Sequence, residues 1–275
     1  MKTVEVLPSG QKVVSREEWF AARVELLKKE KELTRLRDEQ ARQRRGLPCV
    51  KVEKEYRFDG PHGPVTLAEL FGGRSQLVVY HFMFGPDWAE GCPSCSFIAD
   101  HLDGMLPHLA ARDVTLAAVA RAPLAKIEGF KQRMGWRFPW VSSSGNDFNF
   151  DYRVSFAPDE LAGGKVEYNY ARQEFPSAEA PGVSVFSKAS DGTVYHTYST
   201  FARGGEALLG TYAVLDLVPK GRDEDALKFS MVWVRYHDRY DTNVFLDPTK
   251  PYWPSVAADE VPAAACGCGA GEAKA

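Results

Sequence analysis

The chain has 275 residues, 44% of them hydrophobic, which is enough to bury a substantial core. Its formal net charge of -3 gives no reason to expect a nucleic acid or an acidic membrane surface as a partner. No apolar run of about eighteen residues occurs, and the first residues, MKTVEVLPSGQKVV, lack the apolar core of a signal peptide. We therefore expect no membrane span and a cytoplasmic location.

The first predicted element is a long helix from Ser15 to about Arg45, within an N-terminal arm of residues 1–46. Ser15 with Glu18 three residues later is a capping box, and the run Gly-Leu-Pro at 46–48 ends the helix. Large apolar residues are sparse after the first three turns, and the charges alternate in sign. Such a helix is either a solvated arm with internal ion pairs or an element that packs on a second copy, so a homodimer through this helix is one possibility.

The patterns that follow predict a domain over residues 47–240 in which strands and helices alternate. In order they favour a hairpin over 50–67, a short helix over 67–71, a buried strand over 77–84, a helix from Cys92 to about 113, a buried strand over 114–120 and a helix over 123–134. Strand, helix, strand and helix in this order predict an α/β fold with a parallel crossover.

The second half of the domain is predicted to contain an insertion. A short strand over 138–141 is followed by an insertion over about 150–180, a hairpin with strands over 183–188 and 193–200, and a last helix over 205–217. The aromatic run over 233–240, WVRYHDRY, is a strand or turn to which the sequence assigns no role. Residues 241–275 become rich in Ala and Gly and are predicted to be a largely disordered tail.

The residues with the clearest chemistry are Cys92 and Cys95, which form a C-x-x-C at a predicted helix start after a buried strand. Backbone N–H groups and the positive end of the helix dipole can lower the pKa of a thiol at this position. With two residues between the thiols, one can attack a disulfide and the other can resolve the mixed intermediate. The pattern therefore favours thiol–disulfide exchange.

Two other interpretations of the same cysteines remain open. Cys92 and Cys95 could join the tail cysteines, Cys266 and Cys268, as a four-thiolate zinc or copper site. The chain could also be a binding scaffold without redox turnover. The sequence has no G-x-G-x-x-G after a strand and no P-loop, so neither a dinucleotide nor a nucleoside triphosphate is expected as a cofactor.

The order of elements, with a C-x-x-C helix after a buried strand and a proline before a later strand, resembles the thioredoxin fold. The run VTLAELFGGRSQLVVYHF is similar to the alkyl hydroperoxide reductase and thiol-specific antioxidant branch of that superfamily. The runs HFMFGPDWAEGCPSCSF, RMGWRFPWVSS, YHTYSTFARG and WVRYHDRY resemble a bacterial thioredoxin-like family of unknown function whose members are predicted dithiol-disulfide oxidoreductases. This resemblance implies a central mixed sheet flanked by helices.

The resemblance also implies roles for four residues. Cys92 would be the attacking thiol, Cys95 the resolving thiol, Pro181 a cis-proline that presents a backbone edge to substrate, and His81 a buried proton relay for the second thiol. The substrate would be a protein or a small-molecule disulfide. A peroxidatic cysteine of the related branch would have a proline seven residues before it and a Thr or Ser three residues before it. This chain has glycine and alanine there, so direct peroxide reduction is not predicted.

Overall fold

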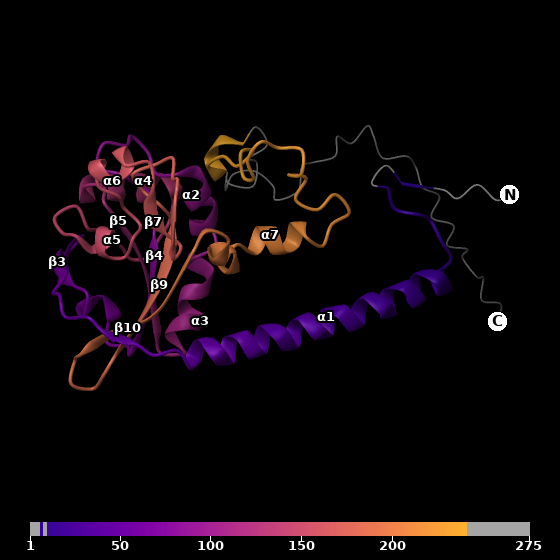
Figure 1. The fold of residues 1–275 in the computed structure, drawn as a ribbon, viewed down its shortest axis with the longest axis horizontal. Coiled ribbons are helices and arrows are strands. Elements are labelled where there is room, and N and C mark those ends of the chain that lie inside the picture. The colour runs from indigo at the N-terminus through magenta and orange to yellow at the C-terminus, as the bar shows by residue number, and fades with distance from the viewer. Residues whose placement is uncertain (1–5, 8–9, 241–275) are drawn as a thin grey trace, which may run out of the picture.

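The structure, a computed structural model, describes residues 6–7 and 10–240. A mixed eight-stranded sheet lies at its centre, in the order β1-β10-β9-β4-β5-β6-β2-β3 (Figure 1). Its strands are β1 (Val50–Lys51), β2 (Arg57–Gly60), β3 (Gly63–Thr66), β4 (Gln76–His81), β5 (Val114–Ala120), β6 (Trp140–Ser142), β9 (Gly182–Lys188) and β10 (Val194–Phe201). Strand β5 lies parallel to β4 and β6, whereas β9 lies antiparallel to both β4 and β10. This arrangement confirms the predicted α/β fold, a central mixed sheet flanked by helices.

The helices agree with most of the predicted positions. They are α1 (Arg16–Arg45), α2 (Pro93–Ala99), α3 (Leu106–Ala110), α4 (Leu124–Met134), α5 (Phe148–Asp151), α6 (Pro158–Ala162) and α7 (Gly210–Leu215), with 3₁₀ turns η1 (Glu69–Phe71), η2 (Asp103–Met105), η3 (Ala202–Leu208) and η4 (His237–Arg239). Helix α4 ends as predicted at Gly135, whose φ of 67° is the left-handed conformation that glycine adopts at low cost. No helix in these described segments has the length and apolar character needed to cross a membrane.

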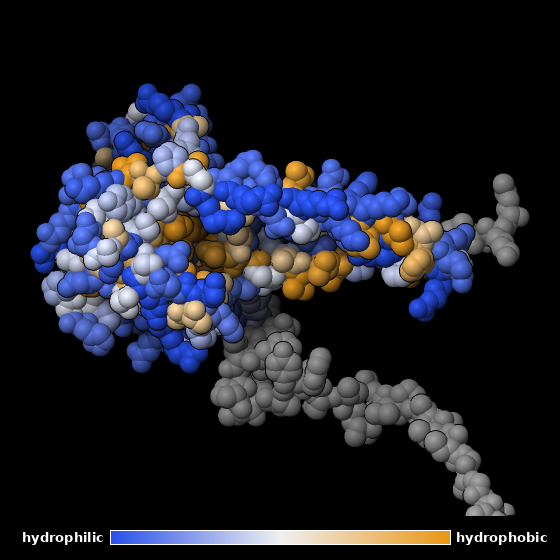
Figure 2. Space-filling model, turned by 90° about the horizontal axis from the view of Figure 1, so that it is seen from below, coloured by the Kyte–Doolittle hydropathy of each residue, from blue (hydrophilic) through white to orange (hydrophobic). Residues whose placement is uncertain are grey.

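Helix α1 forms an arm that extends away from the sheet (Figure 1). It begins at the predicted capping box, in which the Glu18 N–H donates to Ser15 Oγ at 3.1 Å and the Ser15 N–H donates to Glu18 Oε2 at 3.0 Å. None of its residues is buried, and apolar side chains are exposed along the arm (Figure 2), including Trp19, Phe20, Leu26, Leu33 and Leu36. Contact with a second copy through this helix stays a prediction.

Two predicted helices are shorter in the structure. The helix that begins after Cys92 ends at Ala99 instead of continuing to about residue 113, and α3 follows as a separate helix. The carboxylate of Asp103 accepts hydrogen bonds from the N–H groups of Arg137 and Phe138 at 2.8–3.1 Å, so this part of the chain is held as a turn. The last predicted helix is divided into η3 and α7, because glycines in this segment lower its helix propensity.

The sheet separates two apolar clusters, and successive residues of β4 alternate between them. Val78 and Tyr80 contact the cluster beneath α2 and α4, whereas Leu77 and Val79 belong to the cluster beneath η1 and α5. This alternation determines which side chains of β4 can reach the cysteines of α2.

The insertion has a small core of its own and is attached to the sheet by a buried ion pair. A hairpin of β7 (Val166–Tyr168) and β8 (Ala171–Gln173) lies within it, although the sequence showed few strand signals there. Its apolar cluster comprises Val154, Phe156, Val166, Tyr168, Ala180 and Phe201. Glu179 is 2% exposed and accepts hydrogen bonds from Arg121 at 2.9 Å and Ser155 at 2.6 Å. The ion pair fixes the chain just before Pro181.

Candidate active site

The loop between β4 and α2 folds back, so that Cys92 lies next to the carboxyl end of β4. The Phe82 N–H still donates to Val119 of β5 at 2.9 Å, and the Cys92 N–H donates back to the Met83 carbonyl at 3.0 Å. Helix α2 then begins at Pro93, and Cys92 is its N-cap residue. The loop ends are therefore pinned by backbone hydrogen bonds at the position of the first thiol.

Gly91 is required because the loop passes directly over an aromatic ring. A Cβ atom at this position would lie 2.6 Å from Cε1 of Phe82 and 3.0 Å from Cε1 of Phe130. Both rings are buried, so neither can move aside easily. The tryptophan that commonly precedes the first cysteine of thioredoxins would not fit at this position.

The aromatic run over 233–240, which had no predicted role, holds this loop in place. The buried hydroxyl of Tyr236 donates to the Gly91 carbonyl at 2.6 Å. Glu90 pairs with Arg133 of α4 at 2.5 Å and with Arg239 at 2.6 Å. These contacts fix the peptide that immediately precedes Cys92 from two sides.

Cys92 is half-buried and its pKa is lowered to about 7. The largest cause is a hydrogen bond from the Cys95 thiol. Burial opposes it by raising the pKa, and the backbone N–H groups of Cys95 and Ser94 with the Ser94 hydroxyl lower it further. The nearby carboxylate of Glu90 is paired with two guanidinium groups, those of Arg133 and Arg239.

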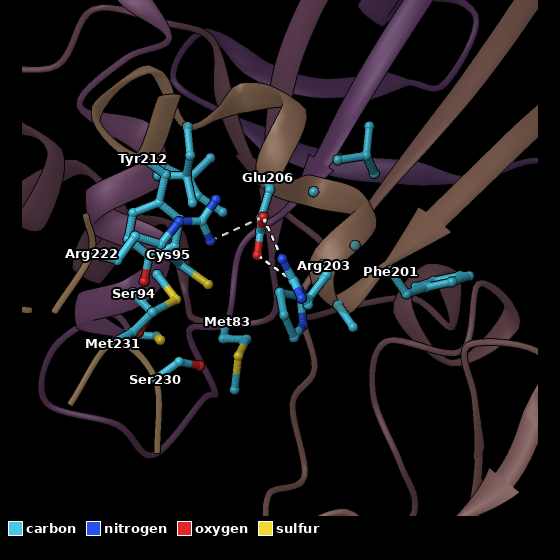
Figure 3. A pocket seen from close by; sticks show the side chains of 18 of the residues that line it. Met83, Ser94, Cys95, Phe201, Arg203, Glu206, Tyr212, Arg222, Ser230 and Met231 are labelled. Carbon is cyan, nitrogen blue, oxygen red and sulfur yellow. Dashed lines mark hydrogen bonds and ion pairs between the residues drawn. The ribbon is translucent and has the colours of Figure 1, made fainter. Parts of the chain in front are cut away.

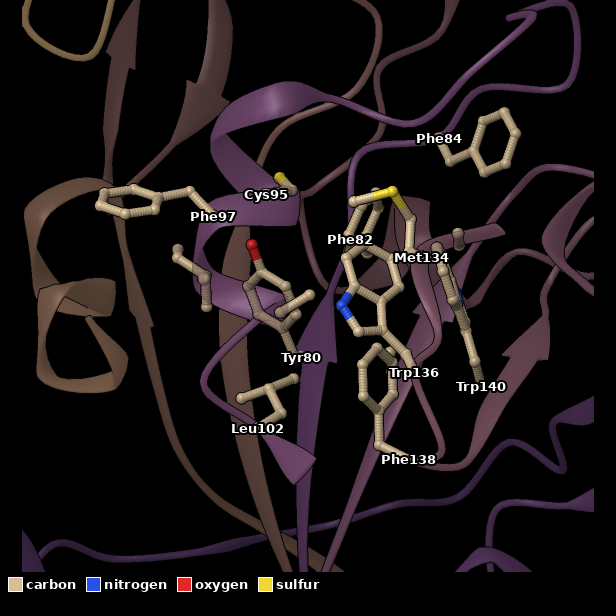
Figure 4. Packing of buried hydrophobic residues seen from close by; sticks show 14 of the residues in the cluster. Tyr80, Phe82, Phe84, Cys95, Phe97, Leu102, Met134, Trp136, Phe138 and Trp140 are labelled. Carbon is tan, nitrogen blue, oxygen red and sulfur yellow. The ribbon is translucent and has the colours of Figure 1, made fainter. Parts of the chain in front are cut away.

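Cys95 is the opposite case, since it is 1% exposed and burial raises its pKa well above 9. The contact with Cys92 raises the pKa further, whereas the Tyr80 hydroxyl and the Met83 N–H act in the opposite direction. The Tyr80 hydroxyl is buried, has no nitrogen or oxygen partner in the described part of the chain, and points toward the Cys95 sulfur (Figure 4). Burial, together with Cys95, raises the pKa of Tyr80 well above 10, so this hydroxyl keeps its proton and can donate to a thiolate at Cys95.

Pro181 lies at the site but is not a cis-proline. It lines the same pocket as both cysteines, yet no cis peptide bond occurs in residues 6–7 and 10–240. The trans form is the ordinary one for X-Pro bonds. The Tyr168 hydroxyl donates to the Pro181 carbonyl at 2.7 Å and accepts from the Ala202 N–H at 3.1 Å. The backbone edge that the resemblance assigned to substrate already has a partner within the chain.

His81 does not join the cysteines. It follows Tyr80 in β4 and faces the opposite side of the sheet, where its Nε2 lies 2.8 Å from Ser184 Oγ and its ring stacks on Tyr152. Burial lowers its pKa to about 3, so the imidazole is neutral at physiological pH. This position does not fit the predicted proton relay, and Tyr80 occupies the place facing Cys95 instead. The alternation of side chains along β4 could have shown that Tyr80 and His81 face opposite sides of the sheet and that only one of them can face the cysteines.

Both cysteines open into a pocket of about 690 Å³ (Figure 3). Its lining comes from the start of β9, from the end of β10 with η3, and from α7 with the segment over 216–231. Two guanidinium groups and four carboxylates line it: Arg203, Arg222, Glu206, Asp216, Glu224 and Asp225. Sequence reasoning missed these residues because nothing in the sequence shows that the chain after α7 folds back over α2.

The structure tests the predicted metal site only in part. Cys266 and Cys268 lie outside the described residues. Within the described ones, no group of three or more His, Cys, Asp or Glu side chains is placed to hold a metal ion. Cys92 and Cys95 would supply two thiolates, and no third ligand of these types joins them there.

A family model described as "Bacterial protein of unknown function (DUF899)" matches residues 8–240. The chain belongs to this family. This confirms the resemblance to a bacterial family of unknown function. None of the curated proteins compared with the chain matches it.

Several solved peroxiredoxin structures are similar to part of the chain. A cysteine-to-serine mutant of Xanthomonas campestris peroxiredoxin Q has a TM-score of 0.39 and 15% identity, covering 57% of this chain and 90% of its own. The peroxidoxin BcpB from Mycobacterium tuberculosis has a TM-score of 0.38 and 15% identity, with coverages of 60% and 94%. A yeast mitochondrial 1-Cys peroxiredoxin has a TM-score of 0.39 and 16% identity, with coverages of 62% and 78%.

Proposed function

We propose that this protein is a dithiol-disulfide oxidoreductase in which Cys92 attacks and Cys95 resolves. The observation that carries the proposal is the contrast between two adjacent thiols. Cys92 is half-buried at the wall of a pocket with a pKa of about 7, whereas Cys95 is buried behind it with a pKa well above 9. A thiol that is half ionised near neutral pH suits attack on a disulfide, because the thiolate is the nucleophile and remains sufficiently basic.

The reaction balances with two thiols and one disulfide. The Cys92 thiolate attacks one sulfur of the substrate R–S–S–R′, forms a Cys92–S–S–R bond and releases R′–S⁻, which takes up a proton. Cys95 then loses its proton to water in the pocket, and its thiolate attacks Cys92 Sγ, which forms the Cys92–Cys95 disulfide, breaks the Cys92–S–S–R bond and releases R–S⁻, which takes up a proton. Two electrons pass from the protein dithiol to the substrate, and an external dithiol must return them for a second turnover.

Tyr80 supports the second step in this proposal. Once Cys92 is in a mixed disulfide, the thiolate of Cys95 has lost its hydrogen-bonding partner Cys92 and lies in a buried apolar setting. A hydrogen bond from the Tyr80 hydroxyl, and one from the Met83 N–H, then stabilise the charge that forms on Cys95. Thioredoxins use a buried carboxylate to accept the proton of the second thiol. In this proposal Tyr80 instead donates a hydrogen bond to the Cys95 thiolate and does not accept the thiol proton.

The test follows oxidation of the Cys92–Cys95 pair when reduced protein is mixed with small and protein disulfides, with hydrogen peroxide as a second oxidant. Non-reducing peptide mapping should find the Cys92–Cys95 disulfide in wild type and in the control Cys49→Ser, whose exposed thiol lies outside the site. Cys92→Ser should react with none of the disulfides. Unaltered disulfide reduction by Cys92→Ser would contradict the proposal, and so would oxidation of wild type by hydrogen peroxide that is faster than its oxidation by every disulfide.

A further inference from the structure

The pocket in front of Cys92 limits which disulfides can reach the thiolate. Phe201 and Arg203 bound it on one side, and Arg222 and Met231 bound it on the other (Figure 3). Its volume of about 690 Å³ falls in the range of sites that enclose small molecules. A disulfide on the surface of a folded protein would have to enter between these two walls.

The backbone beside the cysteines is also unavailable for pairing with an extended protein segment. The Pro181 carbonyl accepts the Tyr168 hydroxyl at 2.7 Å. The next residue, Gly182, starts β9, which is paired with β4 on one side and with β10 on the other. A polypeptide therefore finds no free strand edge here that could hold its disulfide against Cys92.

The charges of the pocket indicate the charge of its ligand. Two guanidinium groups against four carboxylates leave a formal charge of -2 before Cys92 ionises. Both guanidinium groups pair with carboxylates of the pocket, Arg222 partly buried and Arg203 largely exposed. Arg222 makes two bonds of 2.8 Å to Asp216 and one of 3.2 Å to Glu206 while lying over the Tyr212 ring, and Arg203 pairs with Glu206 at 2.9 Å.

Two of the carboxylates are held in their ionised form. Hydrogen bonds from Arg222 lower the pKa of Asp216. Although burial raises the pKa of Glu224, hydrogen bonds from Tyr212, Trp233 and the Met231 N–H lower it overall. The negative potential of the pocket is thus present at neutral pH, and a thiolate at Cys92 adds to it.

We infer that the substrate is a low-molecular-weight disulfide bearing amino groups, bound in the pocket formed by Cys92, Pro181, Glu206 and Asp225. This inference rests on the proposed thiol–disulfide exchange and adds the size and charge of the substrate. A cation is favoured because it meets an excess of carboxylates and approaches a thiolate, and an anion is disfavoured for the same reason.

The experiment measures rate constants for oxidation of reduced, full-length Cys49→Ser protein by four disulfides in rapid-quench mass spectrometry. They are the dication cystamine, neutral bis(2-hydroxyethyl) disulfide, the dianion dithiodiglycolate and insulin, each normalised to its rate with free 2-mercaptoethanol at the same pH. Cystamine should exceed dithiodiglycolate by about tenfold or more at low salt, with the ratio decreasing as salt is added. Insulin should be the slowest after normalisation.

Two variants test whether the pocket charges cause the preference. Asp225→Asn should decrease the ratio of cystamine to dithiodiglycolate, and Asp38→Asn on the distant arm α1 should leave it unchanged. Equal or reversed rates for cation and anion, or insulin as the fastest substrate, would overturn the inference while leaving thiol–disulfide exchange intact. Failure of all four disulfides to oxidise the Cys92–Cys95 pair would overturn the proposed function, and this inference with it.

Discussion

Removing the Cys95 thiol should raise the pKa of Cys92, because the hydrogen bond from Cys95 is the largest cause of its lowering. A pKa of about 7 in place of 9.0 makes about half of Cys92 thiolate at pH 7 instead of about 1%, a change of about fiftyfold. The difference of about two pKa units corresponds to about 2.7 kcal/mol in favour of the thiolate. Cys95→Ala should place the pKa between these values, because Ser94 and the backbone N–H groups remain. Cys95→Ser keeps a hydroxyl donor and should lie closer to 7.

The assay is the rate of alkylation of Cys92 by iodoacetamide between pH 5 and pH 10, measured by peptide mass spectrometry in a Cys49→Ser background. The rate should rise with pH and level off above the pKa, since only the thiolate reacts. Wild type should therefore show a midpoint near 7, and Cys95→Ala a higher midpoint. If Cys95→Ala kept the wild-type midpoint, the hydrogen bond from Cys95 would not be the cause of the lowering. A wild-type midpoint at 9 or above would refute the reasoning altogether.

Three further substitutions test the account. Tyr80→Phe should leave the attack of Cys92 unchanged but slow the release of the mixed disulfide at neutral pH, and an unchanged release rate in rapid-quench experiments would exclude the hydroxyl from that step. Gly91→Ala should lower the free energy of unfolding by roughly 1–3 kcal/mol through its clash with the buried Phe82, whereas Gly129→Ala, in an open helical position, should raise it by about 0.5–1 kcal/mol; urea denaturation compares them. The unfolded chain protonates His81 below about pH 6.5, but the folded protein does so only near pH 3. The free energy of unfolding should therefore decrease as the pH is lowered from 6.5 to 3, by up to about 1.4 kcal/mol per pH unit. His81→Asn should reduce that slope in the same assay. Equal slopes would show that the buried imidazole takes up its proton without unfolding.

Much of the fold could be predicted because its signals are local. The capping box at Ser15, the apolar run of β5 and the glycine after α4 each specify a boundary within a few residues. The C-x-x-C after a buried strand likewise identified Cys92 and Cys95. The break between α2 and α3 also had a local signal that the prediction of one helix overlooked, because Pro107 suits the first turn of α3 but not the interior of a longer helix. The hydrogen bonds from Arg137 and Phe138 to Asp103, which hold the turn, come from residues more than thirty positions away and could not be predicted locally.

The rest of the site depends on contacts between distant parts of the chain. The Tyr236 hydroxyl reaches Gly91 across 145 residues, and Arg222 brings the segment after α7 into the pocket wall. The roles assigned to Pro181 and His81 came from resemblance alone. The bond before Pro181 is trans, and the pleat of β4 turns His81 to the other face of the sheet. Local patterns located Cys92 and Cys95, whereas tertiary packing determined their surroundings.

The central claim is that Cys92 attacks and Cys95 resolves. It is tested most directly by mixing reduced Cys95→Ser protein with cystamine and locating the adduct by non-reducing peptide mass spectrometry. We predict a stable mixed disulfide on Cys92, with wild type treated in the same way yielding a Cys92–Cys95 disulfide and no lasting adduct. An adduct on Cys49 with Cys92 still unmodified, or a lasting adduct on Cys92 in wild type, would contradict the account.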